Sequence, residues 1–365
     1  MTTTARKQHQ MPQPTILLTH SAPARELYYG ARALAALQAL APVRLNEGAP
    51  LAGAALIQAA AGCRVIVADR AVPAPASLFQ ALPDLVAFVR NAVDIRTIDV
   101  PGASAAGVLV TQASPGFVPA VTELILGVMI DLCRGVSIAV GEYRAGRQPP
   151  VRMGRQIAGS TVGVIGYGGI GRRLVRLLLA MEAQVLVADP FAAVQDVPHV
   201  DLHELLAGSD IVVCLAVATP QTAHLMNQAA FAAMRPGALF INASRGELVD
   251  DAALVRALDR GQLAGAALDV GRAQDQMPMP ALAARADIIA TPHIGGLTRA
   301  AAEHQAMETV RQTQAILQGE APPGSVNAAF AHRLRDMGTR DAGAIVLAGP
   351  GPAVHAIPHA PTTEF

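Results

Sequence analysis

Residues 161–189, TVGVIGYGGIGRRLVRLLLAMEAQVLVAD, constrain the fold of this chain more than any other stretch. A short apolar run enters three glycines at GxGxxG spacing, Gly166, Gly168 and Gly171, and a Leu-rich helical run follows directly. This order predicts a β-strand, a tight turn and a helix. Gly166 permits the turn, Gly168 lets the backbone approach a pyrophosphate, and Gly171 allows close packing of helix and strand. The free N–H groups at the helix start would hold the anion.

An acidic residue ends this unit. A second apolar run, residues 185–188, leads into Asp189, which lies 18 residues after Gly171. At about that distance a carboxylate accepts hydrogen bonds from the adenosine ribose of a bound dinucleotide. A 2′-phosphate would be repelled there, and no Arg follows Asp189 directly to bind it. Similar glycines also serve ordinary turns, but strand, helix and acid together favour NAD as the cofactor.

The composition is that of a globular protein without a strong net charge. The 365 residues are enough for two domains, each with a core of its own. The 28 Lys and Arg balance the 28 Asp and Glu, so we expect no nucleic-acid partner and no binding to an acidic membrane surface. The uncharged apolar runs fall short of the ~18 residues of a membrane span. Lys7 is the only lysine, which argues against Schiff-base chemistry and a Walker-type phosphate site.

The cysteines and the two ends of the chain give further expectations. Cys63, Cys133 and Cys214 lie in apolar runs without metal-ligand spacing, which predicts buried reduced thiols, no metal site and a cytoplasmic protein. Residues 1–13 carry charge but lack the apolar core of a signal peptide, so a disordered leader is expected. Residues 331–365 have the Gly, Pro and His content of a poorly ordered tail.

Between these ends, short β-like runs alternate with helical ones, which predicts parallel sheets with helices on both faces. Strands are expected near residues 15–20, 42–46, 63–69, 84–90, 107–112, 161–165, 185–188, 210–217, 238–244, 265–270 and 287–292. A long apolar helix over residues 118–144 would bridge the two domains, and a helix over 298–317 would return the chain.

Five segments, VGVIGYGGIGRR, VADP, INASRGELVDDAALVRAL, GAALDV and ATPHIGG, carry a resemblance to a known family. In these segments the chain resembles the D-isomer-specific 2-hydroxyacid dehydrogenases, among them phosphoglycerate and glyoxylate/hydroxypyruvate reductases. In that family an Arg, an acid 29 residues later and a His some 20 residues beyond converge beside the nicotinamide. The resemblance implies an NAD-dependent enzyme that acts on a small anionic 2-hydroxy or 2-keto acid and usually forms a homodimer.

Two residues match the catalytic positions of the family. Arg245, in NASRG, follows a buried strand, and its guanidinium suits a substrate carboxylate and the adjacent carbonyl. His293, in TPHIGG, matches the general acid/base, which would protonate the new alkoxide or remove the hydroxyl proton. Asp269 matches an acid placed near the nicotinamide, although a strand-end cap is the alternative interpretation. The remaining matches to cofactor-contact positions are Gly169, Ile170, Pro190, Thr222, Ala243, Ser244, Gly295 and Gly296.

The first departure from the family pattern concerns the partner of the histidine. The position 29 residues after Arg245 is Gln274, where most of the family has Glu, and Asp275 is adjacent. An amide can orient the imidazole but adds no negative charge, so either Gln274 or Asp275 is the candidate partner of His293. Gln at this position resembles the formate dehydrogenase branch, but the asparagine of that branch is matched here by Phe117.

The second departure lies in the substrate domain. The family usually reads R-x-G-x-G-x-D-N-x-D, a loop whose backbone N–H groups face the substrate carboxylate, and this chain reads RNAVDIRTID over residues 90–99. Ala92 and Asp94 replace both glycines, and Asp94 would repel a carboxylate if it pointed inward. Arg90 and Arg96 are the residues that could compensate.

These observations together predict an NAD-dependent D-2-hydroxyacid dehydrogenase of the α/β class. Its Rossmann doubly wound cofactor domain, residues 104–297, would be inserted in a smaller flavodoxin-like substrate domain of residues 14–103 and 298–330. The altered loop and the missing Glu keep two alternatives open, a non-catalytic NAD-sensing scaffold of the same fold and formate oxidation.

Overall fold

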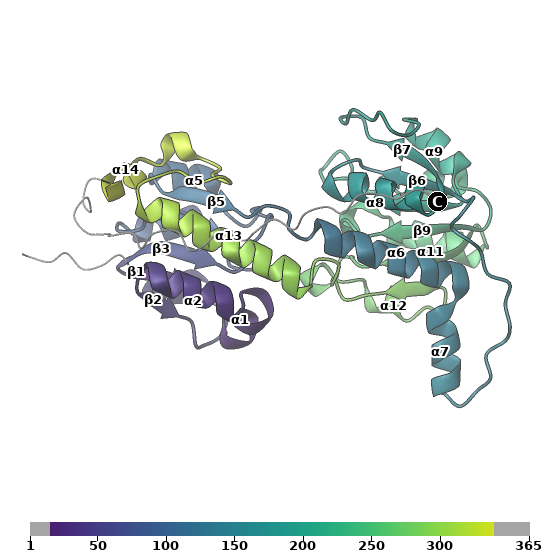
Figure 1. Cartoon of the computed structure of the whole chain (residues 1–365), viewed down its shortest axis with the longest axis horizontal. Coiled ribbons are helices and arrows are strands. Elements are labelled where there is room, and N and C mark those ends of the chain that lie inside the picture. The colour runs from purple at the N-terminus through teal and green to yellow at the C-terminus, as the bar shows by residue number, and fades with distance from the viewer. Residues whose placement is uncertain (1–14, 339–365) are drawn as a thin grey trace, which may run out of the picture.

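The computed structural model describes residues 15–338, which form two lobes, each built on a parallel sheet with helices on both faces (Figure 1). This confirms the predicted α/β class. The predicted leader and residues 339–365 lie outside the described residues. No single helix within residues 15–338 is long and apolar enough to cross a membrane, but α6 (Val118–Arg134) and α7 (Val136–Arg144) together pass that test as a pair bent by 69°.

The first lobe corresponds to the expected substrate domain and keeps that name below. It contains a five-stranded sheet in the order β2-β1-β3-β4-β5. The central strands β3 and β4 are buried along almost their whole length, as expected of parallel strands that are covered on both faces. One face packs against α2, α13 and α14, and the other against α3, α4 and α5. The elements of this domain are β1 (Thr15–Leu18), α1 (Ala22–Tyr28), α2 (Ala31–Leu40), β2 (Val43–Leu45), α3 (Gly53–Ala60), β3 (Cys63–Ala68), α4 (Ala76–Ala81), β4 (Ala87–Arg90), α5 (Val100–Ala105), β5 (Leu109–Gln112), α13 (Arg299–Leu317), η3 (Ala328–Phe330) and α14 (His332–Gly338).

The second lobe, the cofactor domain, contains a six-stranded sheet in the order β11-β10-β9-β8-β6-β7. A parallel bridge between His199 and Val187 adds the remnant of one further strand beyond β7. With this bridge, the strands from there to β10 follow the 3-2-1-4-5-6 order of a dinucleotide-binding sheet, and β11 lies beyond β10 as an additional strand. Its elements are α6 (Val118–Arg134), α7 (Val136–Arg144), β6 (Thr161–Ile165), α8 (Gly169–Ala180), β7 (Gln184–Ala188), α9 (Leu202–Gly208), β8 (Ile211–Cys214), α10 (Gln228–Ala233), β9 (Ala238–Asn242), η1 (Gly246–Leu248), α11 (Asp251–Asp259), β10 (Leu263–Leu268), η2 (Gln274–Gln276), α12 (Pro280–Ala283) and β11 (Ile288–Ala290).

The predicted helix over residues 118–144 is broken, and that expectation was wrong. Gly135, at φ 65°, ends α6 in the left-handed conformation, which glycine adopts without a Cβ penalty. The Asp131 side chain then accepts from the backbone N–H of Ser137 in the first turn of α7. α6 packs on the cofactor sheet, whereas α7 projects from the lobe (Figure 1).

Two predicted domain boundaries also need correction. β5 pairs with β4, so the strand over residues 109–112 belongs to the substrate domain although the cofactor domain was expected to begin at 104. At the other end, α14 buries Leu334 and Met337 against the substrate-domain core, so the expected tail from 331 begins with an ordered helix. The hydrophobic residues of α14 are few and widely spaced, and their burial depends on the core that the rest of the domain provides.

Candidate active site

The glycine loop between β6 and α8 has the geometry of a dinucleotide site. Gly166 has φ 99°, and a Cβ there would lie 2.7 Å from the backbone of Leu215. A Cβ on Gly171 would overlap the carbonyl oxygen of Gly166, so this residue lets α8 approach the strand. A Cβ on Gly168 would meet no protein atom within 4 Å. Gly166 and Gly171 are therefore required by the fold, and Gly168 leaves the helix start open to a ligand.

Asp189 lies at the end of β7 and faces this loop. Its carboxylate accepts from the backbone N–H groups of Tyr167 (2.7 Å), Phe191 (2.9 Å) and Ala192 (3.1 Å). Partial burial acts to raise the pKa of Asp189, but these hydrogen bonds outweigh it and hold the pKa below its usual value. Asp189 is thus an ionised carboxylate next to the glycine loop, in the position expected for the ribose.

Three further candidate residues follow three neighbouring strands. Arg245 comes after β9, Asp269 directly after β10, and His293 after β11. Because β9, β10 and β11 are adjacent and parallel, these residues share the carboxyl edge of the sheet, where open α/β sheets bind ligands.

Asp269 holds the histidine loop in place. One carboxylate oxygen accepts from the Thr291 hydroxyl (2.6 Å) and the Ile294 N–H (2.9 Å), and the other accepts from the Gly295 N–H (2.8 Å). Only 7% of Asp269 is exposed. Its side chain therefore fixes the turn on which His293 stands, as the strand-end interpretation expected.

The imidazole of His293 has a partner that neither sequence hypothesis named. Nδ1 lies 2.8 Å from the backbone carbonyl oxygen of Asp275, and no hydrogen bond within residues 15–338 joins it to the side chain of Gln274 or Asp275. A carbonyl can only accept, so Nδ1 carries the proton and Nε2 is the nitrogen left for other chemistry. Asp275 and His293 both adopt left-handed backbone conformations, at φ 55° and 54°. Such conformations cost energy in non-glycine residues and are typical of functional sites.

Arg245 follows β9 and lies next to Asp94 of the substrate domain. Its guanidinium donates to the carbonyl of Ser244 (2.7 Å), and its side chain is one third exposed. Asn242 donates to the Arg245 carbonyl (2.9 Å), and the Ser244 hydroxyl donates to Ala216 (2.6 Å). Burial lowers the pKa of Arg245, which Asp94 opposes, and the group remains a cation at neutral pH.

The altered loop after β4 is organised by side chains rather than by backbone donors. Arg90 is fully buried, and it donates to the backbone carbonyls of Asp69 and Val72 and to the hydroxyl of Thr97. Burial lowers the pKa of Arg90 to about 10, so it stays charged at neutral pH. Arg90 holds two loops of its own domain together, and the expectation that it compensates for the lost glycines was wrong.

Arg96 binds Asp94, the residue whose negative charge it was expected to compensate. It donates to Asp94 through Nε (3.1 Å) and Nη2 (2.8 Å), and its backbone N–H donates to the same carboxylate (3.0 Å). The Asp94 carboxylate in turn lies 4.0 Å from Nη2 of Arg245, across the boundary between the domains. Asp94 therefore points toward Arg245 rather than away from it.

The other predicted cofactor-contact positions follow β6, β7, β8, β9 and β11, at the carboxyl edge of the cofactor sheet. Gly169 and Ile170 form the first turn of α8, and Pro190 follows Asp189. The Thr222 hydroxyl donates to Val217 (2.7 Å) and shapes the turn after β8. Sequence reasoning missed two exposed apolar side chains at the ends of β7 and β8, Phe191 and Val217, although an apolar residue directly after the VADP segment was a usable signal. Ala243 follows β9, and Gly296 follows Gly295 in the histidine loop.

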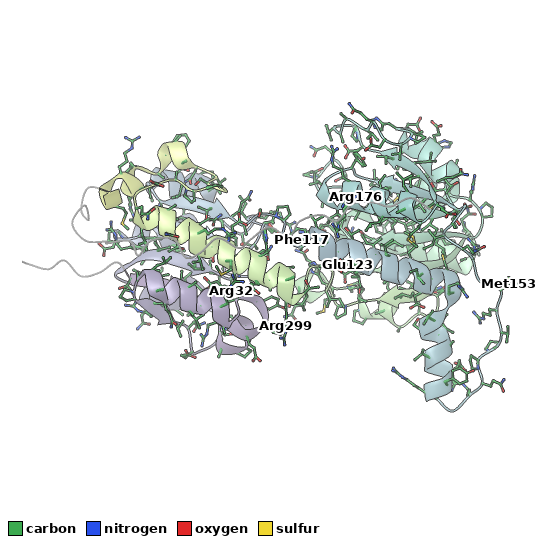
Figure 2. The ribbon with its side chains drawn as sticks, viewed as in Figure 1. Arg32, Phe117, Glu123, Met153, Arg176 and Arg299 are labelled. Carbon is green, nitrogen blue, oxygen red and sulfur yellow. The ribbon has the colours of Figure 1, made fainter. Side chains whose placement is uncertain are left out.

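Phe117 lies at the start of α6, between the two lobes (Figure 2). It packs against Gly296 and the apolar cluster of the cofactor domain. It offers no amide at the position where the formate dehydrogenase branch has one.

Comparison with known proteins agrees with this geometry. The family model described as D-isomer specific 2-hydroxyacid dehydrogenase, NAD binding domain, matches residues 126–295. The (S)-sulfolactate dehydrogenase of Chromohalobacter salexigens is 33% identical over 72% of this chain and 88% of its own length. The D-3-phosphoglycerate dehydrogenase of Mycobacterium tuberculosis is 31% identical over 74% of this chain, which spans about half the length of that relative (52%).

Among solved structures, the TT0316 protein from Thermus thermophilus is similar at a TM-score of 0.78 and 28% identity, over 86% of this chain and 99% of that one. The chain therefore belongs to the D-isomer specific 2-hydroxyacid dehydrogenase family. The domain built on β6–β11 is its NAD-binding domain, and NAD is the cofactor.

Proposed function

We propose that this protein transfers a hydride between NAD(H) and a small 2-hydroxy or 2-keto acid. The observation that carries the proposal is the placement of Arg245 and His293 after β9 and β11, the two strands that flank β10, on the same edge of the sheet as a glycine loop that is open at Gly168. A cation for the carboxylate, a proton carrier for the hydroxyl and a site for the nicotinamide then share one edge of the sheet.

The residues of the cofactor domain fit NAD. The open backbone at Gly168 and the start of α8 would hold the pyrophosphate, and the Asp189 carboxylate would accept from the ribose hydroxyls. Phe191 and Val217 would line the adenine. When bound, the nicotinamide supplies the hydride donor or acceptor, and the chain supplies position and charge.

The substrate would be held and polarised by Arg245, whose planar guanidinium can bind a carboxylate and the neighbouring carbonyl oxygen together. Nε2 of His293 would then exchange the proton of the hydroxyl group, because Nδ1 is occupied by Asp275. Asp269 acts as a positioning residue through its three hydrogen bonds to the loop of His293.

Substitution of Arg245 tests the proposal. NADH oxidation by Arg245→Ala, followed by absorbance with a panel of 2-keto acids, should fall at least about 100-fold, since the lost interaction is charge-assisted and partly desolvated. NADH binding, measured by fluorescence, should stay within about threefold of the unsubstituted protein. Arg235→Ala, which removes an arginine paired with Asp210 elsewhere in the cofactor domain, is the matched control. Unchanged turnover by Arg245→Ala would contradict the proposal, and NADH binding without turnover of any keto acid would favour the scaffold alternative.

We further infer that the protein is a homodimer. Support comes from apolar side chains that face outward on α7 and the following segment: Val136, Ile138, Val140, Tyr143, Val151 and Met153. Met153 lies far out on that segment (Figure 2). Light scattering should give twice the chain mass of 37.7 kDa, and Val151→Asp combined with Met153→Asp should halve the measured mass.

A cytoplasmic location, supported by the three buried free thiols, is likewise a proposal.

A further inference from the structure

Four charged side chains form a chain of ion pairs across the boundary between the domains. Asp94 and Arg96 come from the loop after β4, and Arg245 and Glu247 come from the segment after β9. Arg96 lies 2.8 Å from Asp94 and 3.9 Å from Glu247, and Asp94 lies 4.0 Å from Arg245. The carboxylate of Asp94 therefore stands between a cation of its own domain and the proposed substrate-binding cation of the other.

At the position of Asp94, a backbone N–H donor would bind an anionic substrate better than a carboxylate does. The related loop pattern has glycine there, and a glycine turn presents N–H groups to an anion. Here the Asp94 carboxylate itself accepts from the Arg96 N–H, so that donor is used within the loop. Burial acts to raise the pKa of Asp94, but the hydrogen bonds from Arg96 outweigh it and keep the pKa below its usual value. The negative charge is thus present at neutral pH.

The charged groups around Arg245, counted together with Arg245 itself, have a net charge that one further negative charge would balance. The groups that act on its guanidinium are Asp94, Arg96, Glu247 and Arg70. Together with Arg245 they comprise three cations and two carboxylates, which leaves one net positive charge. A ligand with one carboxylate balances this set, whereas a second anionic group would bring an uncompensated charge near Asp94, in a partly desolvated site where such charges interact strongly.

We propose that Asp94 is a specificity residue that restricts the substrate to 2-keto and 2-hydroxy acids with a single negative charge. Acids that carry a second carboxylate, a sulfonate or a phosphate are excluded by its charge. This inference rests on the proposed function, because it assumes that the substrate carboxylate binds at Arg245.

The test compares ligand pairs that differ by one charge, in the unsubstituted protein and in Asp94→Asn. Asparagine retains an oxygen for the Arg96 N–H and removes the negative charge, together with one of the two acceptor oxygens that the Arg96 guanidinium binds. The kcat/KM for 2-ketobutyrate should exceed that for oxaloacetate by at least about tenfold, and Asp94→Asn should reduce this ratio on the order of tenfold. Asp259→Asn, the same change in another Asp–Arg pair, should leave the ratio unchanged.

A binding measurement separates this inference from the proposed function. Oxamate and oxalate are nearly isosteric and differ by one negative charge, and both can be titrated into the NADH complex by fluorescence. Oxamate should bind more tightly, and Asp94→Asn should narrow the difference on the order of tenfold. If keto acids are reduced but Asp94→Asn changes neither the kcat/KM ratio nor the binding ratio, the specificity role of Asp94 is overturned and the proposed function stands. If the binding ratio shifts as expected while no keto acid is reduced, the proposed function fails and the charge selection by Asp94 stands.

Discussion

Two loops at the carboxyl edges of two parallel sheets show opposite ways to prepare a site for an anion. The loop after β6 has glycines and an open helix start, so its backbone donors face a ligand without side chains in the way. At the end of β4 Arg90 donates to a carbonyl of the loop after β3, and in the loop after β4 Arg96 donates to Asp94. The first loop suits any ligand that presents a pyrophosphate group. The second selects by fixed charges, and it is where this chain differs from the pattern that its cofactor domain follows.

The largest effect is expected in the cofactor loop. Gly166→Ala should lower the free energy of unfolding by about 4 kcal/mol, because it adds left-handed strain and a Cβ 2.7 Å from the Leu215 backbone. Gly168→Ala is the matched control, since its Cβ meets no protein atom. That variant should keep its stability within about 0.5 kcal/mol. It should still lose at least about tenfold in NADH affinity. Urea unfolding and NADH fluorescence measure the two effects, and equal stability losses in both variants would contradict this division of roles.

Arg90 and Arg96 should differ strongly although they belong to one loop. Arg90→Met should cost about 3 kcal/mol of stability, because buried carbonyls at Asp69 and Val72 lose their donor. Arg96→Met should cost less than about 1 kcal/mol, since its side chain is half exposed. Urea unfolding of both variants provides the comparison. A larger loss for Arg96→Met would show that the loop is held mainly by its exposed ion pair.

The substrate-domain edge also buries a titratable group, His20, after β1. Burial lowers the pKa of His20 to about 4, against which Asp69, at 3.6 Å, acts only in part. Between pH 6.5 and 4 the unfolded chain binds a proton that folded His20 does not, so stability should fall as the pH falls through this window. The loss amounts to up to about 3 kcal/mol. Unfolding of His20→Gln over the same range should lack this component, and identical pH slopes would show that His20 titrates normally.

The smallest expected effect concerns the choice between the two nicotinamide dinucleotides. The Asp189 carboxylate should favour NADH over NADPH by at least about tenfold, which corresponds to 1.4 kcal/mol. Fluorescence titration of both reduced cofactors measures it, with Asp189→Asn as the variant that should narrow the difference. Equal affinities for NADH and NADPH in the unsubstituted protein would show that the Asp189 carboxylate does not select between the two cofactors.

The sequence by itself determined both sheets and the cofactor loop. Strand runs, glycine spacing and the acid after β7 are local patterns, and the overlap of a Cβ at Gly171 with the carbonyl of Gly166 shows a requirement that is set within the motif itself. The edge on which Arg245 and His293 lie followed from the same patterns, because parallel strands place their carboxyl ends together.

Only the tertiary structure decided what those side chains contact. The partner of His293 is a backbone carbonyl, which every residue possesses, so no side-chain pattern at Gln274 or Asp275 could reveal it. The burial of Arg90 depends on loops after β3 and β4 that meet only in the folded domain, and the approach of Asp94 to Arg245 depends on how two domains face each other. Local patterns report the backbone that a residue needs, whereas a contact between distant segments depends on the whole packing.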